Sequence, residues 1–159
     1  MPIYNFTVQG PGGNPNPQAF ASVGPVIAVQ IEVPAPLAAQ FQQQQQPPPP
    51  PAVGFALIDT GASITCAEET VLARLGINPT GVAQVSAAGG TATHSVYPAR
   101  FAFPGTPVPN IDFVGVVGVN LQGQTVPNHG PIIALIGRDI LLRCVLVYNG
   151  AGGMYSLSF

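Results

Sequence analysis

Glycine and proline break this chain into short segments. The 159 residues include 19 Gly and 19 Pro. Together with Asn they separate runs rich in β-branched and aromatic side chains, a pattern typical of an all-β domain of short strands. The length fits one domain, residues 1–159. The predicted strands are Ile3–Val8, Val26–Val33, Val53–Ile58, Val82–Ala87, Thr93–Phe103, Ile111–Val119, Ile132–Ile136, Val145–Tyr148 and Met154–Phe159.

One predicted strand shows the alternation of a half-buried strand most clearly. Tyr97, Ala99, Phe101 and Phe103 would share one face, because alternate side chains of a strand point the same way. Pro98 lies within this run and predicts an edge position or a β-bulge there.

Two short helices complete the predicted mainly-β fold. Thr65 and Glu68 have the spacing of a capping box, and Gly76 stands where a helix end favours positive φ, so we expect a helix over Ala67–Leu75. We interpret Glu68 as a cap and not as a catalytic acid. The second helix is predicted over Arg138–Leu142.

Charged residues are scarce, at 6% of the chain against about 25% in an average soluble domain. All four basic residues are Arg and they form no cluster, which argues against a nucleic-acid partner. Apolar runs end well before the roughly 18 residues that a membrane-spanning helix needs. The first residues lack the basic and apolar regions of a secretory signal, so we expect a cytoplasmic location and no membrane partner.

The region of about 34–52 differs in composition from the rest of the chain. Five Gln at 42–46 precede five Pro at 47–51. We predict a surface insertion with a mobile Gln tract and an extended polyproline II segment. The proline run is either a spacer or a ligand for an SH3- or WW-type groove.

The segment most suggestive of chemistry joins an apolar strand to Asp59-Thr60-Gly61. A tight turn there would present the Asp59 carboxylate, and Gly61 would let another backbone segment approach closely. Such turns are common, so this tripeptide alone does not indicate catalysis.

A second segment strengthens that interpretation. The apolar strand 132–136 leads into Gly137-Arg138-Asp139, with Asp139 well placed for the helix dipole. In order and context, the two segments resemble the paired motifs of the retropepsins, the retroviral-type aspartic proteases. The matching residues are Asp59-Thr60-Gly61-Ala62 and Leu135-Ile136-Gly137-Arg138-Asp139. The resemblance covers about Val53–Phe159. It implies a retropepsin-like acid protease barrel with one lobe per chain.

The resemblance implies roles for the first motif. Asp59 matches the catalytic aspartate, and Thr60 matches the threonine whose hydroxyl interlocks with its twin across a dimer axis. Gly61 and Ala62 match the rest of the loop, which lies along the substrate backbone.

It also implies roles for the second motif. Gly137 matches a glycine that passes behind the catalytic loop, and Arg138 matches a structural arginine that is largely desolvated. Many retroviral members have an acidic partner for this Arg at the position of Ser63. The partner in this chain is left open among Asp139, Glu68 and Glu69.

Between the two motifs the family has a hairpin flap. Three consecutive segments of this chain have the order of such a hairpin: Val82–Ala87, the tip Ala88-Gly89-Gly90, and Thr91–Phe103. The Gly-Gly turn between strand-like arms supports the prediction of a hairpin here. A glycine-rich tip would also be mobile, as a lid must be.

One Asp-Thr-Gly loop per chain implies that two copies build the active site. Two Asp59 carboxylates in close contact cannot both ionise, so they would share a proton and hydrolyse a peptide by general acid-base catalysis without a cofactor. A peptide or protein substrate would lie extended beneath the flap. We expect pocket walls from Val116, Val117 and Leu121, and a place for Tyr155–Phe159 in the dimer interface or at an ordinary sheet edge.

Other hydrolytic chemistries have little support. His94 and His129 have no third ligand at useful spacing, so no metal site is expected. No Gly-x-Ser-x-Gly motif is present, and we interpret Cys66 and Cys144 as buried free thiols.

Two alternatives to a peptidase remain. One is a catalytically silent dimer of the same fold that binds extended peptides or acts as an interaction module. The intact Asp59-Thr60-Gly61 argues against it. The other makes the Gln/Pro insertion the binding element and the β domain its scaffold.

Overall fold

The computed structural model describes residues 2–9, 13–87 and 89–159. Its described part is mainly β, as predicted. In chain order the elements are β1 (Ile3–Thr7), α1 (Pro17–Val23), β2 (Val26–Glu32), α2 (Ala35–Gln43), β3 (Ala52–Ile58), β4 (Cys66–Glu68), α3 (Glu69–Arg74), β5 (Gly81–Ala87), β6 (Gly90–Ala102), β7 (Ile111–Val119), β8 (Thr125–Val126), β9 (Gly130–Ile136), α4 (Arg138–Leu141), β10 (Val145–Asn149) and β11 (Met154–Ser158).

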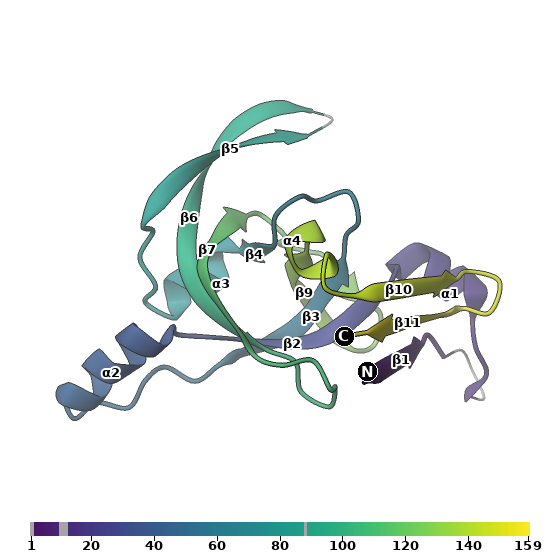
Figure 1. Ribbon diagram of the computed structural model, residues 1–159, viewed down its shortest axis with the longest axis horizontal. Helices are drawn as coiled ribbons and strands as arrows, with labels where there is room; N and C mark the ends of the chain where they lie inside the picture. Colours follow the sequence, from purple (N-terminus) through teal and green to yellow (C-terminus); the bar gives the residue numbers. More distant parts are fainter. Residues whose placement is uncertain (1, 10–12, 88) are drawn as a thin grey trace.

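The larger sheet closes into a barrel (Figure 1). Its strand order is β2-β3-β9-β4-β7-β6-β5, and an additional pairing of β2 with β6 closes the first six strands into the barrel. Closure removes the exposed edges that these six strands would present in an open sheet, and β5 extends from β6 outside the barrel. β3 and β9 run parallel, and this pairing brings the carboxyl ends of the two motif-bearing strands together.

The barrel interior holds the main hydrophobic core. The predicted face of Tyr97, Ala99, Phe101 and Phe103 is buried in this core. The register between β6 and β7 shifts between Tyr97 and Ala99, which places the predicted bulge at Pro98. These two predictions are confirmed.

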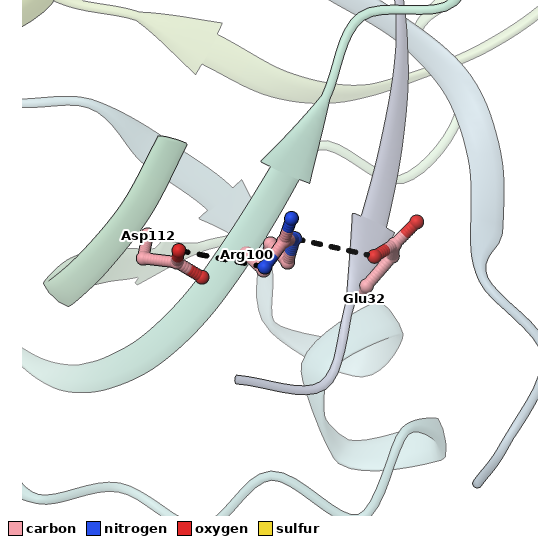
Figure 2. Close-up of polar contacts among 3 residues, drawn as sticks. All are labelled: Glu32, Arg100 and Asp112. Atoms are coloured by element: carbon pink, nitrogen blue, oxygen red, sulfur yellow. Dashed lines mark ion pairs between the residues drawn. The ribbon is translucent and has the colours of Figure 1, made fainter. Parts of the chain in front are cut away.

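An ion-pair ladder crosses the seam where the barrel closes (Figure 2). Arg100 on β6 lies opposite Glu32 of β2 and Asp112 of β7 in the two registers. Its guanidinium lies 3.6 Å from one carboxylate and 3.5 Å from the other. The three side chains are partly solvated, so the ladder favours register more than it adds stability.

A second, three-stranded sheet has the order β1-β11-β10. The strand predicted over Met154–Phe159 is therefore its central strand, paired on both sides within its own chain. The expectation that Tyr155–Phe159 forms a sheet edge is wrong, whereas its place in a dimer interface stays a prediction. The edges of this sheet are β1 and β10, and β10 exposes Val145, Val147 and Tyr148.

All nine predicted strands are present, with ends shifted by up to three residues. The described chain has four helices, however, and not two. α1 begins with Asn16 as its N-cap and Pro17 at its first position, a signal that could have predicted it. The helix expected over Ala67–Leu75 is shorter, because Cys66–Glu68 pairs with β7 and β9 as a strand.

The Gln/Pro insertion is more ordered than predicted. The first part is helix α2, which includes Gln42 and Gln43, and its Leu37 and Phe41 pack against the main core. Partial burial of these two side chains stabilises the helix, which composition alone did not indicate. Pro47–Pro51 then leads back to β3 outside any helix or strand and is largely exposed. None of the described helices has the length and apolar character needed to cross a membrane.

Candidate active site

Asp59 stands at the end of β3, on the loop that leads to β4. Its N–H donates to the carbonyl of Ile136 at the end of β9 (3.0 Å), so the parallel β3–β9 pair fixes its backbone. Its Oδ1 accepts from the N–H groups of Gly61 (2.8 Å) and Ala62 (3.3 Å). The side chain is half-buried, and no hydrogen bond to Oδ2 is found in the described residues. One carboxylate oxygen is thus held by the turn and the other is open.

Gly137 packs directly behind this loop. A Cβ at Gly137 would lie 2.5 Å from the carbonyl carbon of Ile64 and 2.8 Å from the nitrogen of Thr65. Both neighbours are backbone atoms, which cannot move aside as a flexible side chain can. The close approach of β9 and α4 to the loop therefore requires glycine at this position.

Arg138 holds the first half of the loop through backbone contacts. Its N–H donates to the carbonyl of Ala62 (2.9 Å). Its Nη1 donates to the carbonyls of Thr60 (3.1 Å) and Gly61 (3.5 Å). Like Thr60 and Gly61 themselves, Arg138 is exposed.

We expected Arg138 to be largely desolvated, but its side chain is exposed to solvent. None of its open candidate partners, Asp139, Glu68 and Glu69, forms an ion pair with it in the described residues. With Ser63 in place of an acid, the guanidinium binds loop carbonyls and stays in solvent.

Asp139 holds the second half of the loop. Its Oδ2 accepts from the N–H of Thr65 (3.0 Å) and its Oδ1 from the Thr65 hydroxyl (2.7 Å). The same hydroxyl accepts from the N–H of Gly137 (3.1 Å), and Thr65 is completely buried. We expected Thr65 to cap a helix. Its role as a link between the loop and α4 was missed, because a contact over 74 residues leaves no local signal.

Two further carboxylates lie beside the loop and are occupied elsewhere. The buried Glu68 accepts from the N–H of Leu121 and from the hydroxyl of Thr70 (2.9 Å). Glu68 is thus a cap, as predicted, but for α3 and without Thr65. Glu69 accepts from the Tyr97 hydroxyl (2.6 Å).

The hairpin predicted between the two motifs is present as β5–β6, here called the lid. Its arms pair from Gly81–Val96 to Ala87–Gly90, and Figure 1 shows them rising from the barrel and curving over. Gly89 and Gly90 are exposed at the tip, whereas Ala88 lies outside the described residues.

The two faces of the lid differ. Cross-strand hydrogen bonds link polar side chains on one face, Gln84 with Thr93 (2.8 Å) and Ser86 with Thr91 (2.9 Å). The other face carries Ala83, Val85 and Ala92 together with His94, because alternate residues share a face. His94 bonds to the barrel, so the small apolar residues face the body of the protein.

The two cysteines are free, as predicted, but only Cys66 is buried, and Cys144 is half-buried. Burial raises the pKa of the Cys66 thiol to about 11, and the charges of Asp139 and Asp59 add to this. The thiol is therefore protonated at neutral pH and is no nucleophile.

The residues expected to form pocket walls are instead part of the core. Val116, Val117 and Leu121 are between 0% and 5% exposed. They belong to the part of β7 that is buried on both faces and to the loop after it, and a local pattern does not distinguish such positions from a pocket wall. Ile64, on the loop that carries Asp59, is an exposed apolar side chain.

The histidines take part in separate contacts. His94 Nδ1 lies 3.0 Å from the carbonyl oxygen of Gly118, and His129 packs edge-on against Phe55. Within the described part of the chain, no group of three His, Cys, Asp or Glu residues could hold a metal ion.

Neither a search of protein-family models nor a search of curated proteins finds a match to this chain.

Proposed function

We propose that the protein is an aspartic endopeptidase whose active site forms between two copies of the chain. The observation that carries this proposal is how hydrogen bonds fix the loop around Asp59. Asp59 has one fixed and one open carboxylate oxygen, on a turn that α4 holds through Arg138 and Asp139. A general acid-base pair needs such preorganised carboxylates.

Half of the catalytic machinery is present in one chain. A single carboxylate cannot act at once as the base for water and as the acid for the scissile carbonyl oxygen. In a twofold dimer two Asp59 carboxylates would meet, and mutual repulsion would keep one proton on the pair. The ionised member would take a proton from water while the protonated member donates to the carbonyl oxygen. Hydrolysis then proceeds without a covalent intermediate.

The edge strand β10 is the surface on which we place the second copy. It is unpaired on one side in the described chain, and it exposes Val145, Val147 and Tyr148. It carries no charged residue that would oppose pairing with another strand. Antiparallel pairing of two such edges about a twofold axis would join the three-stranded sheets into one and cover the apolar side chains.

The substrate would lie extended between the catalytic loop and the lid. The body-facing side of the lid is lined by Ala83, Val85 and Ala92, small apolar residues that leave room for substrate side chains. Ile64, exposed on the loop that carries Asp59, would provide an apolar contact on the opposite side. We therefore expect a preference for peptides with apolar residues around the cleaved bond.

Cleavage of a peptide library at pH 4 to 7 by wild type and Asp59→Asn tests the proposal. Asp59→Asn keeps the size of the side chain but removes proton transfer, so activity should fall below a few per cent of wild type. Pepstatin-like inhibitors should bind wild type, because their hydroxyl can replace the bridging water. Equal cleavage by both proteins would contradict the catalytic role of Asp59. Peptide binding without cleavage by wild type would support the catalytically silent alternative.

A further inference from the structure

The lid leaves the barrel at one point on β6. The last cross-strand pair between β6 and β7 is Val96–Val117. Towards its N-terminus, β6 pairs only with β5, whose partner along its whole length is β6. The two arms therefore form a two-stranded ribbon that is attached to the barrel only at its base. Such a ribbon is marginally stable by itself.

His94 provides a contact from the lid to the barrel beyond that point. It lies two residues outside Val96, and its Nδ1 is 3.0 Å from the carbonyl oxygen of Gly118, the residue after Val117. A carbonyl oxygen only accepts, so Nδ1 must carry a proton and donate it. The ring is half-buried between the lid and the end of β7.

In the described residues this is the one side-chain hydrogen bond between the ribbon and another element. The Thr80 hydroxyl, in the loop that precedes β5, donates to the carbonyl oxygen of Val96 at the base of the ribbon (3.4 Å). The other two bonds, Gln84 with Thr93 and Ser86 with Thr91, join the two arms to each other. They stiffen the ribbon but do not set its angle to the barrel.

The acceptor of this bond is itself rigidly supported. A Cβ at Gly118 would lie 2.7 Å from the Tyr97 ring, so the ring packs directly against the Gly118 backbone. Tyr97 is buried, and its hydroxyl donates to Glu69 at the start of α3. The bond from His94 thus ties the lid to a part of the barrel with little freedom to move.

We propose that His94 is a positioning residue that holds the lid in its closed position over bound peptide. This inference rests on the proposed peptidase function. Without the Nδ1 bond the lid would sample open positions more often. In those positions the marginally stable ribbon lacks its support, so its two arms also separate more often. Substrate binding would weaken, while the chemical step at Asp59 would change little, because His94 touches the lid and not the reacting atoms.

Three variants of His94 separate this role from simple packing. The side-chain amide nitrogen of His94→Asn lies at nearly the same distance from the backbone as Nδ1, and it can donate to Gly118. The amide nitrogen of His94→Gln lies further out, near the position of Nε2. His94→Ala removes the donor and the ring together. The Asn and Gln variants are a matched pair that differ in where the donor lies.

The first measurement is amide hydrogen exchange of the lid, which does not require activity. We expect His94→Ala and His94→Gln to exchange the amides of β5 about tenfold faster than wild type, the size expected for one hydrogen bond. His94→Asn should remain within about twofold of wild type, and the amides of β9 should not change in any variant. Equal exchange in wild type and the Ala variant, or equal exchange in the Asn and Gln variants, would overturn the anchor.

The second measurement is steady-state cleavage of the best library peptide. His94→Ala and His94→Gln should raise KM about tenfold with kcat within about twofold, and His94→Asn should restore KM. Faster lid exchange with an unchanged KM would overturn the positioning role. If wild type cleaves no peptide, the peptidase proposal fails and the positioning role fails with it, while the exchange data still show whether His94 anchors the hairpin.

Discussion

The loop that carries Asp59 connects two strands, whereas the lid is a β-hairpin, and the chain holds the two segments in opposite ways. The loop 59–65 is fixed by hydrogen bonds from α4, which lies over 70 residues away in sequence. The lid is held by bonds between its own two arms and by one contact from His94.

Under the proposed function, each segment is held as its role requires. A catalytic carboxylate would have to keep its geometry, and long-range bonds to backbone atoms on both sides of a turn prevent it from shifting. A lid would have to open for a polymer substrate, so few contacts to the barrel would be an advantage.

Gly137→Ala should have the largest effect on stability. The φ of Gly137 is −86°, which alanine adopts freely, so only the clash with the backbone of Ile64 and Thr65 matters. We expect a loss of about 3 kcal/mol in the free energy of unfolding, measured with urea. Gly89→Ala at the lid tip is the control, because nothing lies within 4 Å of a Cβ there. A loss at Gly89 as large as that at Gly137 would remove the distinction between the two segments.

Asp139→Ala should have the next largest effect. It leaves the N–H and the hydroxyl of the buried Thr65 without their acceptor, at a cost of about 2 kcal/mol. Asp112→Ala is a matched control, since its carboxylate is 57% exposed and joins a surface ion pair worth under about 1 kcal/mol. Equal denaturation midpoints for the two variants would show that the link to Thr65 does not hold the loop.

Arg138→Ala should destabilise the protein by only about 1 kcal/mol. The guanidinium is exposed and bonds to carbonyl oxygens of the loop, so its removal leaves no buried charge behind. Removing one partner of a buried ion pair would cost about 3 to 5 kcal/mol. A loss in that range by urea denaturation would show that Arg138 has a buried carboxylate partner.

Ionisation of the Cys66 thiol should leave the free energy of unfolding unchanged at neutral pH and lower it in alkaline solution. Burial raises the pKa of this thiol from 9.0, the ordinary value, to about 11 in the fold. Above pH 9 the unfolded chain therefore binds fewer protons than the folded one, and stability falls as pH rises towards 11. Cys66→Ser does not titrate in this range, so the free energy of unfolding of wild type should fall more steeply. If the free energies of unfolding of wild type and Cys66→Ser changed in parallel from pH 8 to 11, this would contradict the burial of the thiol at the end of the loop.

The sequence predicted nine of the eleven described strands, including the hairpin that forms the lid, because these depend on local patterns. Alternation identified the face that includes Tyr97 and Phe101, and Pro98 marked the bulge. Asp59 and Gly137 stand out because their motifs impose a turn and a close approach that few other residues permit.

The remaining features depend on contacts between distant residues. The burial of α2 through Phe41, the link from Thr65 to Asp139 and the solvation of Arg138 follow from how elements pack in three dimensions. The bond from His94 to Gly118 likewise spans two strands. No local spacing rule contains this information.

Mixing wild type with Asp59→Asn tests the shared active site most directly. If two Asp59 residues form one site, a fixed amount of wild type equilibrated with a ninefold excess of the variant should keep about one tenth of its activity, because chains pair at random. Activity per wild-type chain should also fall on dilution below the dimer dissociation constant. Unchanged activity in the mixture, with a monomeric mass by sedimentation, would contradict the proposal that two chains share the site.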